Sequence, residues 1–190
     1  VDQAHAMGLE VWGLVDNFSE NVTTAEVLAD VGKRTRIIEQ LLAAAEDCGM
    51  DGINVDFEQL TEDSIPHFLQ FLRELTIKAH EKNLVVSVDN LVPQNYNMYY
   101  KRGTQGKIVD YVIIMGYDEH YSGSEKAGSV ASLPFVESGI KRTLEEVPAS
   151  KVINAIPFYT RVWTETFGQE RPTSEVLGMD GADRYIQEHQ

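Results

Sequence analysis

Short apolar runs of strand length alternate with helical patterns along most of this 190-residue chain. Strands and helices that alternate in this way favour a parallel sheet whose strands are joined by right-handed crossover connections. The runs are apolar throughout, which is typical of strands that are covered on both faces. The expected strands lie near residues 9–15, 52–58, 84–89, 110–117 and 152–158.

The connecting segments differ in how clearly they predict helices. Apolar residues recur at helical spacing over residues 37–48, 65–79 and 136–147, so each of these segments is expected to be an amphipathic helix. Residues 160–190 are more polar and contain several glycines. This last segment is therefore expected to be an irregular excursion with only a short helix near residues 182–188.

Two architectures fit this alternation: a doubly wound sheet and a (β/α)8 barrel. A glycine-rich phosphate loop does not follow the first expected strand, which weakens the nucleotide-binding version of the doubly wound sheet. Complete barrels typically need about 250 residues. Five strands in 190 residues would therefore form an incomplete barrel.

The charge balance excludes some partners. The formal net charge is -14, which repels nucleic acids and anionic lipids, so neither is an expected partner. The chain shows no secretory signal and no apolar stretch long enough to span a bilayer. Its one cysteine, Cys48, allows no internal disulfide.

Polar or aromatic residues follow every expected strand. In both architectures, ligands bind at the carboxyl ends of parallel strands. The residues at these ends are Asp16-Asn17-Phe18, Asp56-Phe57-Glu58, Asp89-Asn90, Gly116-Tyr117-Asp118 and Pro157-Phe158-Tyr159. This distribution predicts one site assembled from several strands.

The segment 51–58 carries the strongest chemical signal. Side chains alternate along a strand, so Asn54, Asp56 and Glu58 should point to the same face. Neighbouring carboxylates in a low-dielectric site repel each other, which favours a proton on one of them. A protonated acid is the group that glycosidic cleavage requires at the leaving oxygen. Two alternatives remain: acids at a solvated strand end by chance, or hard oxygen ligands for a metal, although no histidine lies nearby.

Several of these segments resemble glycoside hydrolase family 18, the chitinase family. The segment from Asp51 to Glu58 resembles the family signature Asp-x-x-Asp-x-Asp-x-Glu, and Met115-Gly116-Tyr117-Asp118 resembles its Met-x-Tyr-Asp motif. Residues 11–17 and 156–161 resemble its third and seventh barrel strands. The resemblance implies an α/β fold that is part of a (β/α)8 TIM barrel, covering about strands 3 to 7. It also implies that residues 1–190 belong to a catalytic domain.

One branch of the family is especially similar: the bacterial enzymes that degrade peptidoglycan, including spore cortex-lytic enzymes. The similarity includes Tyr117-Asp118-Glu119-His120 and residues 127–133. Asn54 departs from the pattern, because chitinases usually carry Asp at this position. Since Asn cannot share or store a proton, Asp56 loses one charged neighbour.

The resemblance also implies a mechanism. Glu58 would protonate the leaving oxygen and then activate water, while the 2-acetamido oxygen of the substrate attacks the anomeric carbon with overall retention. Asp56 would hold the acetamido N–H, and Tyr117 would hold the acetamido oxygen. No cofactor or metal is expected. The further residues expected to line or support the sugar site are Asp51, Asn54, Asn17, Met115, Asp118, Tyr159 and Arg161.

The resemblance implies hydrolysis of β-1,4 bonds next to N-acetylglucosamine, in the peptidoglycan of the spore cortex or cell wall. The expected partner is a polysaccharide containing N-acetylglucosamine, and the expected location is extracytoplasmic. Three alternatives are kept: hydrolysis of chitin or its oligomers, sugar binding without hydrolysis by a lectin-like relative, and an inactive folding unit of a larger enzyme. A partial barrel has two open sheet edges, which favours homo-oligomer formation through those edges.

Overall fold

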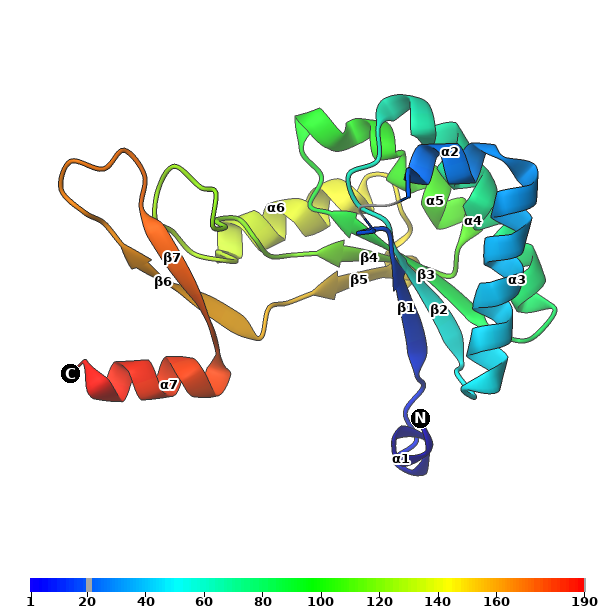
Figure 1. Ribbon diagram of the computed structural model, residues 1–190, viewed down its shortest axis with the longest axis horizontal. Coiled ribbons are helices and arrows are strands. Elements are labelled where there is room, and N and C mark those ends of the chain that lie inside the picture. The colour runs from blue at the N-terminus through cyan, green and yellow to red at the C-terminus, as the bar shows by residue number, and fades with distance from the viewer. Residues whose placement is uncertain (20–21, 190) are drawn as a thin grey trace.

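The computed structural model describes residues 1–19 and 22–189, and its centre is a five-stranded parallel sheet (Figure 1). The strands are β1 (Trp12–Asp16), β2 (Gly52–Asp56), β3 (Val85–Leu91), β4 (Tyr111–Met115) and β5 (Val152–Ala155). Their order in the sheet is β1-β2-β3-β4-β5, and every neighbouring pair is parallel. A doubly wound sheet reverses its strand order, so this sequential order corresponds to an open section of a (β/α) barrel.

Helices α2 to α6 cover one face of this sheet, whereas α1 lies beyond the start of β1 and α7 lies beside the strands β6 (Tyr159–Thr164) and β7 (Thr173–Gly178) (Figure 1). The helices are α1 (Asp2–Ala6), α2 (Thr24–Ala29), α3 (Val31–Asp47), α4 (Ile65–His80), α5 (Arg102–Ile108), α6 (Leu133–Leu144) and α7 (Met179–Glu188). Short 3₁₀ turns occupy Glu62–Ser64, Asn95–Tyr100 and Ala149–Lys151. In the part of the chain that the structure describes, no helix is both long and apolar enough to cross a bilayer.

Local sequence signals set the limits of the longest helix. The side chain of Asp30 caps α3 by accepting a hydrogen bond from the backbone N–H of Lys33 at 2.8 Å. Gly49 follows the helix with φ +65°, a left-handed conformation that glycine adopts without steric cost. The chain can therefore turn directly into β2.

The two faces of the sheet differ in chemistry. Residues in register on parallel neighbours point to the same side, and Val15, Val55 and Val88 are paired in this way on the side facing the helices. Val55 and Val88 are completely buried there. The opposite face carries Asp16 and Asp56, which are also in register. The apolar core and the carboxyl groups are thus separated by the sheet.

The end of the chain differs from the sequence-based expectation of an irregular excursion. β6 (Tyr159–Thr164) and β7 (Thr173–Gly178) form an antiparallel hairpin, and α7 follows where the short helix was expected. β-branched and aromatic residues such as Tyr159, Val162 and Thr173 favour strands even where the segment is polar overall. The prediction of irregular structure over residues 160–178 is therefore wrong.

Candidate active site

Carboxyl groups gather where the parallel strands end. Asp16 and Asp56 pair in register as the last residues of β1 and β2, and Glu58 follows two residues later. On the other side of β2, Val55 pairs with Val88, so the next residues, Asp56 and Asp89, lie side by side. These groups come from three adjacent strands, as the sequence pattern predicts for a site at this edge.

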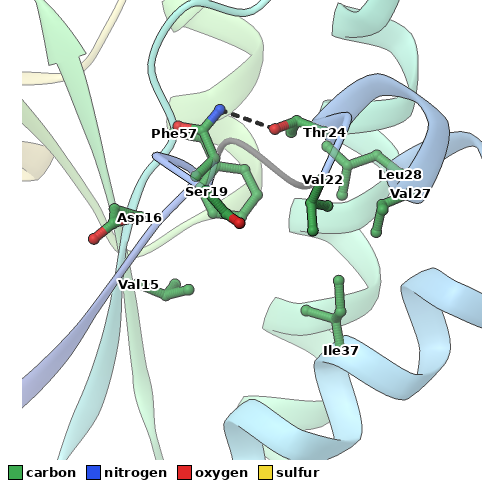
Figure 2. Close-up of a pocket in the computed structure, with 10 residues that line it drawn as sticks. Val15, Asp16, Ser19, Val22, Thr24, Val27, Leu28, Ile37 and Phe57 are labelled. Atoms are coloured by element: carbon green, nitrogen blue, oxygen red, sulfur yellow. Dashed lines mark hydrogen bonds between the residues drawn. The ribbon is translucent and has the colours of Figure 1, made fainter.

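The backbone of Glu58 is held by the side chain of Asn17. The amide oxygen of Asn17 accepts from the Glu58 N–H at 2.9 Å, and the amide nitrogen donates to the Glu58 carbonyl at 2.8 Å. The same nitrogen donates to Thr24 Oγ1 at 3.1 Å (Figure 2). Asn17 is expected to contact sugar, but both its amide oxygen and its amide nitrogen form hydrogen bonds with other residues of the protein.

Two tyrosines from the 3₁₀ turn at Asn95–Tyr100 hold the next part of this loop. The hydroxyl of Tyr100 accepts from the Leu60 N–H at 3.1 Å, and the hydroxyl of Tyr99 donates to the Leu60 carbonyl at 2.9 Å. Between these two anchors, Gln59 has φ +54°, an uncommon conformation for a residue with a side chain. The position of Glu58 is thus fixed on both sides along the chain.

Burial and like charge act together on the two central acids. Burial raises the pKa of the Glu58 carboxyl, and the carboxylates of Asp56 and Asp118 raise it further. Burial also raises the pKa of Asp56, to which the neighbouring charge of Asp16 adds. Glu58 is therefore biased toward the protonated form that a proton donor needs.

Asp89 is the most strongly shifted carboxyl group at this edge. Burial, with a smaller contribution from the charge of Asp56, raises the pKa of Asp89 to about 6. The Asn54 amide donates to Asp89 Oδ1 at 3.3 Å, which partly opposes the shift. Asn54 thus contacts a neighbouring strand, and its own Oδ1 is buried without a hydrogen-bond partner among the described residues.

Tyr117, Asp118 and Tyr159 form the opposite side of the site. The Tyr159 hydroxyl donates to Asp118 Oδ1 at 2.7 Å, and the Tyr117 and Tyr159 rings meet edge to face with centroids 6.2 Å apart. Burial and the surrounding carboxylates raise the pKa of Tyr117 to about 12, so its hydroxyl keeps its proton near neutral pH. Tyr117 can therefore donate a hydrogen bond to a ligand.

Gly116 allows the end of β4 to lie close against β5. A Cβ at this position would lie 2.7 Å from Oδ1 of Asn154 and 2.9 Å from the Ala155 carbonyl oxygen, both too close for a side chain. Met115, immediately before it, ends β4 and is 6% exposed. Asp89 and Leu91 of β3 are in register with Ile113 and Met115, so Met115 lies on the face that carries Asp89, and its expected contact with sugar stays a prediction.

Two of the expected site residues lie away from the carboxyl cluster. Asp51 precedes β2 and accepts hydrogen bonds from the Val11 N–H at 2.7 Å and from His5 Nε2 at 2.8 Å. Asp51 therefore holds the backbone at the start of β2, and its expected support of the sugar site stays a prediction. Arg161 lies in β6, where it donates to Ser174 Oγ at 3.1 Å.

The cluster also contains two acids for which the sequence pattern predicted no role, Asp16 and Asp89. Both were recognised as strand ends, but their distance from Asp56 depends on the register between strands. A count of residues from the carboxyl end of each strand could have aligned them with Asp56. In the parts of the chain that are described, three or more His, Cys, Asp or Glu residues do not gather in a metal-binding arrangement.

Two hollows border this region. An apolar cavity of about 260 Å³ lies on the helix side of β1, between Val15, Phe57 and Ile37 (Figure 2). Asp16 and Asn17 at the end of β1 also line this cavity, whereas Glu58 does not. A second, more polar hollow of about 360 Å³ is lined by Glu58, Asn17 and Phe18. The second hollow is the one open to the candidate acid.

The sheet has the strand order of a (β/α) barrel, and acids gather at its carboxyl edge. These two features define the class of protein as a (β/α)-barrel protein with a carboxyl-rich site. Residues 12–187 match the family described as glycosyl hydrolases family 18, and the chain belongs to this family. In the described residues, the parallel strands form an open, five-stranded section of a barrel.

Known relatives include enzymes that act on different polymers. A cortical fragment-lytic enzyme of Bacillus subtilis is 30% identical over 146 residues, which are 73% of this chain and 33% of the relative. Endochitinase 1 of Metarhizium anisopliae is 26% identical over 185 residues, covering 86% of this chain and 42% of the relative. A chitinase structure from Chromobacterium violaceum superposes with a TM-score of 0.85 at 24% identity, covering 98% of this chain and 60% of that one. The chain spans between 33% and 48% of the length of the curated relatives that it matches.

Proposed function

We propose that the protein is a retaining glycoside hydrolase that cleaves β-1,4 bonds next to N-acetylglucosamine in peptidoglycan. The observation that carries this proposal is the Glu58 carboxyl group, which is held at its backbone and has a raised pKa. Such a group can give its proton to the leaving glycosidic oxygen and afterwards take a proton from water. Membership of family 18 supports this chemistry over other uses of an acid cluster.

The reaction uses the acetamido group of the substrate as its nucleophile. Asp56 accepts the acetamido N–H and balances the positive charge that develops at the anomeric carbon. Tyr117 remains protonated because its pKa is raised to about 12, and it donates to the acetamido oxygen. The oxygen is thereby held for attack, which is a positioning effect. Substrate-assisted families of this kind need no second carboxylate as nucleophile.

The polymer is proposed to be peptidoglycan of the spore cortex or cell wall, and the site of action is therefore extracytoplasmic. The relatives include three cortical fragment-lytic enzymes and a putative sporulation-specific glycosylase, all from Bacillus, which supports this choice.

The test is hydrolysis by the intact protein, as it occurs in its host, of purified peptidoglycan and of chitin oligomers. We expect new reducing ends from peptidoglycan at the higher rate, and NMR of the first products should show retained anomeric configuration. Faster cleavage of chitin would move the substrate assignment to chitin. Inverted products would contradict the substrate-assisted route, and tight binding without cleavage would replace the enzyme by a sugar-binding protein.

A further inference from the structure

We propose that Asp89 is a positioning residue that stores a proton beside Asp56 and so keeps Asp56 ionised during the reaction. This inference rests on the proposed hydrolase function, because Asp89 acts through a residue of that site. Asp89 lies in β3, next to the β2 strand that carries Asn54 and Asp56, and Asn54 donates a hydrogen bond to it.

The register places the two carboxyl groups next to each other. Val55 pairs with Val88, so Asp56 and Asp89 follow as neighbours on adjacent parallel strands. Side chains in register on parallel strands point to the same face, which here is the face opposite the helices. Asp56 and Asp89 therefore share one partly buried space.

One carboxylate oxygen of Asp56 has no hydrogen-bond donor among the described residues. Oδ1 of Asp56 is buried and accepts no hydrogen bond among the described residues. Asn54 donates to Oδ1 of Asp89 at 3.3 Å, so a proton on Oδ2 of Asp89 leaves that bond intact. A neutral Asp89 would supply the O–H that the Asp56 carboxylate otherwise lacks, and a hydrogen bond to the charged form lowers the pKa of Asp56.

The charged and polar groups facing Asp89 favour the neutral form. Burial raises the pKa of Asp89 most. The charges of Asp56, the last residue of β2, and of Glu58, two residues later, raise it further, while the hydrogen bond from the Asn54 amide lowers it. From the end of β4, Tyr117 faces the pair as a protonated phenol whose own pKa is raised by Asp89. Two adjacent carboxyl groups with these neighbours are expected to share one proton below about pH 6.

Asn54 is close to both acids, because it contacts Asp89 and is two residues before Asp56. Asn54 points to the same face as Asp56 but holds no exchangeable carboxyl proton. The acid that can share a proton with Asp56 stands instead on β3, where Asn54 contacts it. Asp89 thus supplies from the neighbouring strand what residue 54 cannot.

The experiment compares the pH dependence of kcat/KM for the intact wild-type protein, Asp89→Asn and Asp89→Leu, on the polymer that the wild type cleaves. Asn keeps a donor toward Asp56 but cannot ionise, so the acid limb should stay in place. Its basic limb should move to lower pH, because Glu58 loses a negative neighbour. Leu also removes the donor, so its acid limb should move to higher pH. Asp47→Asn, the same change on the exposed surface of α3, should leave both limbs unchanged.

A second measurement needs no activity. The folded state binds the proton of Asp89 more tightly than the unfolded chain, so stability is lost as pH rises through the folded pKa of about 6. Asp89→Asn should therefore raise Tm at pH 8 and leave it nearly unchanged at pH 4. If the wild type cleaves but the scaled pH profiles of all variants superimpose, the role of Asp89 is overturned. If the wild type cleaves nothing, the hydrolase function fails, and a Tm change equal at both pH values would overturn the proton store separately.

Discussion

The two hydrogen bonds between Asn17 and the backbone of Glu58 connect the end of β1 to the proposed proton donor. Asn17→Ala removes both bonds, so the Glu58 carboxyl should lose its fixed orientation. Because small misplacements of a catalytic group are costly, we expect kcat to fall by about tenfold or more with KM changed less than about twofold. Steady-state kinetics on the preferred polymer measure both constants.

Thr24→Val is the matched control, since it removes only the 3.1 Å bond between Thr24 and the Asn17 amide nitrogen. It should change kcat far less than Asn17→Ala. A rise in KM with unchanged kcat in Asn17→Ala would instead mean that Asn17 contacts the sugar, as the family resemblance implied.

The raised pKa of Glu58 makes a prediction about pH. Glu58 must be protonated to act, so activity is lost as pH rises through its pKa in the folded protein. The Asp118 carboxylate raises that pKa, and Asp118→Asn should therefore move the basic limb of kcat/KM to lower pH. Glu119→Gln changes the adjacent residue, whose side chain only accepts from the Ser132 N–H, and should leave the limb in place. An unmoved limb in Asp118→Asn would contradict the assignment of this limb to Glu58.

At the scale of single residues, the alternation of side chains along β2 could be read from the sequence. Asn54, Asp56 and Glu58 share the parity that puts them on one face, and the structure brings Asn54 and Asp56 to the carboxyl cluster through Asp89 and Asp16. Asp51 has the opposite parity and precedes the strand, where it binds the Val11 N–H.

Among the elements, α3 and α4 are joined by an ion pair between Arg34 and Glu74. Arg34 is 6% exposed and donates to Glu74 through Nε at 2.8 Å and Nη2 at 2.9 Å. Glu74→Gln leaves the guanidinium without its counter-charge, and we expect a loss of about 2 kcal/mol in the free energy of unfolding. Chemical denaturation at neutral pH measures this loss.

The exposed pair of Lys141 and Glu137 on α6 is the control. Glu137→Gln should change the free energy of unfolding far less, because water replaces the lost contact. Arg34 holds the pKa of Glu74 below its ordinary value, so the stabilisation exists above the unfolded pKa and is lost as pH falls through the folded one. Equal effects of the two substitutions would contradict the importance of burial.

The elements that sequence could predict are those that follow local patterns. The five parallel strands are short apolar runs, and the helices of residues 37–48 and 65–79 show a clear apolar stripe. The hairpin of β6 and β7 has no such pattern. Its strands are stabilised by pairing with each other, as Tyr159 pairs with Gly178, and such pairing across many residues leaves little local signal.

For the molecule as a whole, the open sheet has consequences for association. β1 and β5 are the two edges of the sheet, and Leu14 on the face opposite the helices is 59% exposed. Unpaired strand edges beside exposed apolar residues invite pairing between chains. We expect a polypeptide of residues 1–190 alone to self-associate as its concentration rises in sedimentation velocity experiments.

Leu14→Lys should weaken this association, because it places a charge beside the open edge. Leu133→Lys adds the same charge at the exposed start of α6 and should have no such effect. A polypeptide that stays monomeric at every concentration would contradict the role of the edges.

The central claim is that Glu58 is the proton donor, and one comparison tests it most directly. Hydrolysis of peptidoglycan and chitin oligomers is measured for the intact wild-type protein and for Glu58→Gln, with Glu62→Gln as a control in the following 3₁₀ turn. Loss of a general acid predicts at least about a hundredfold lower rate for Glu58→Gln, at unchanged Tm, and a rate near wild type for Glu62→Gln. A folded Glu58→Gln protein that cleaves at the wild-type rate would contradict the account.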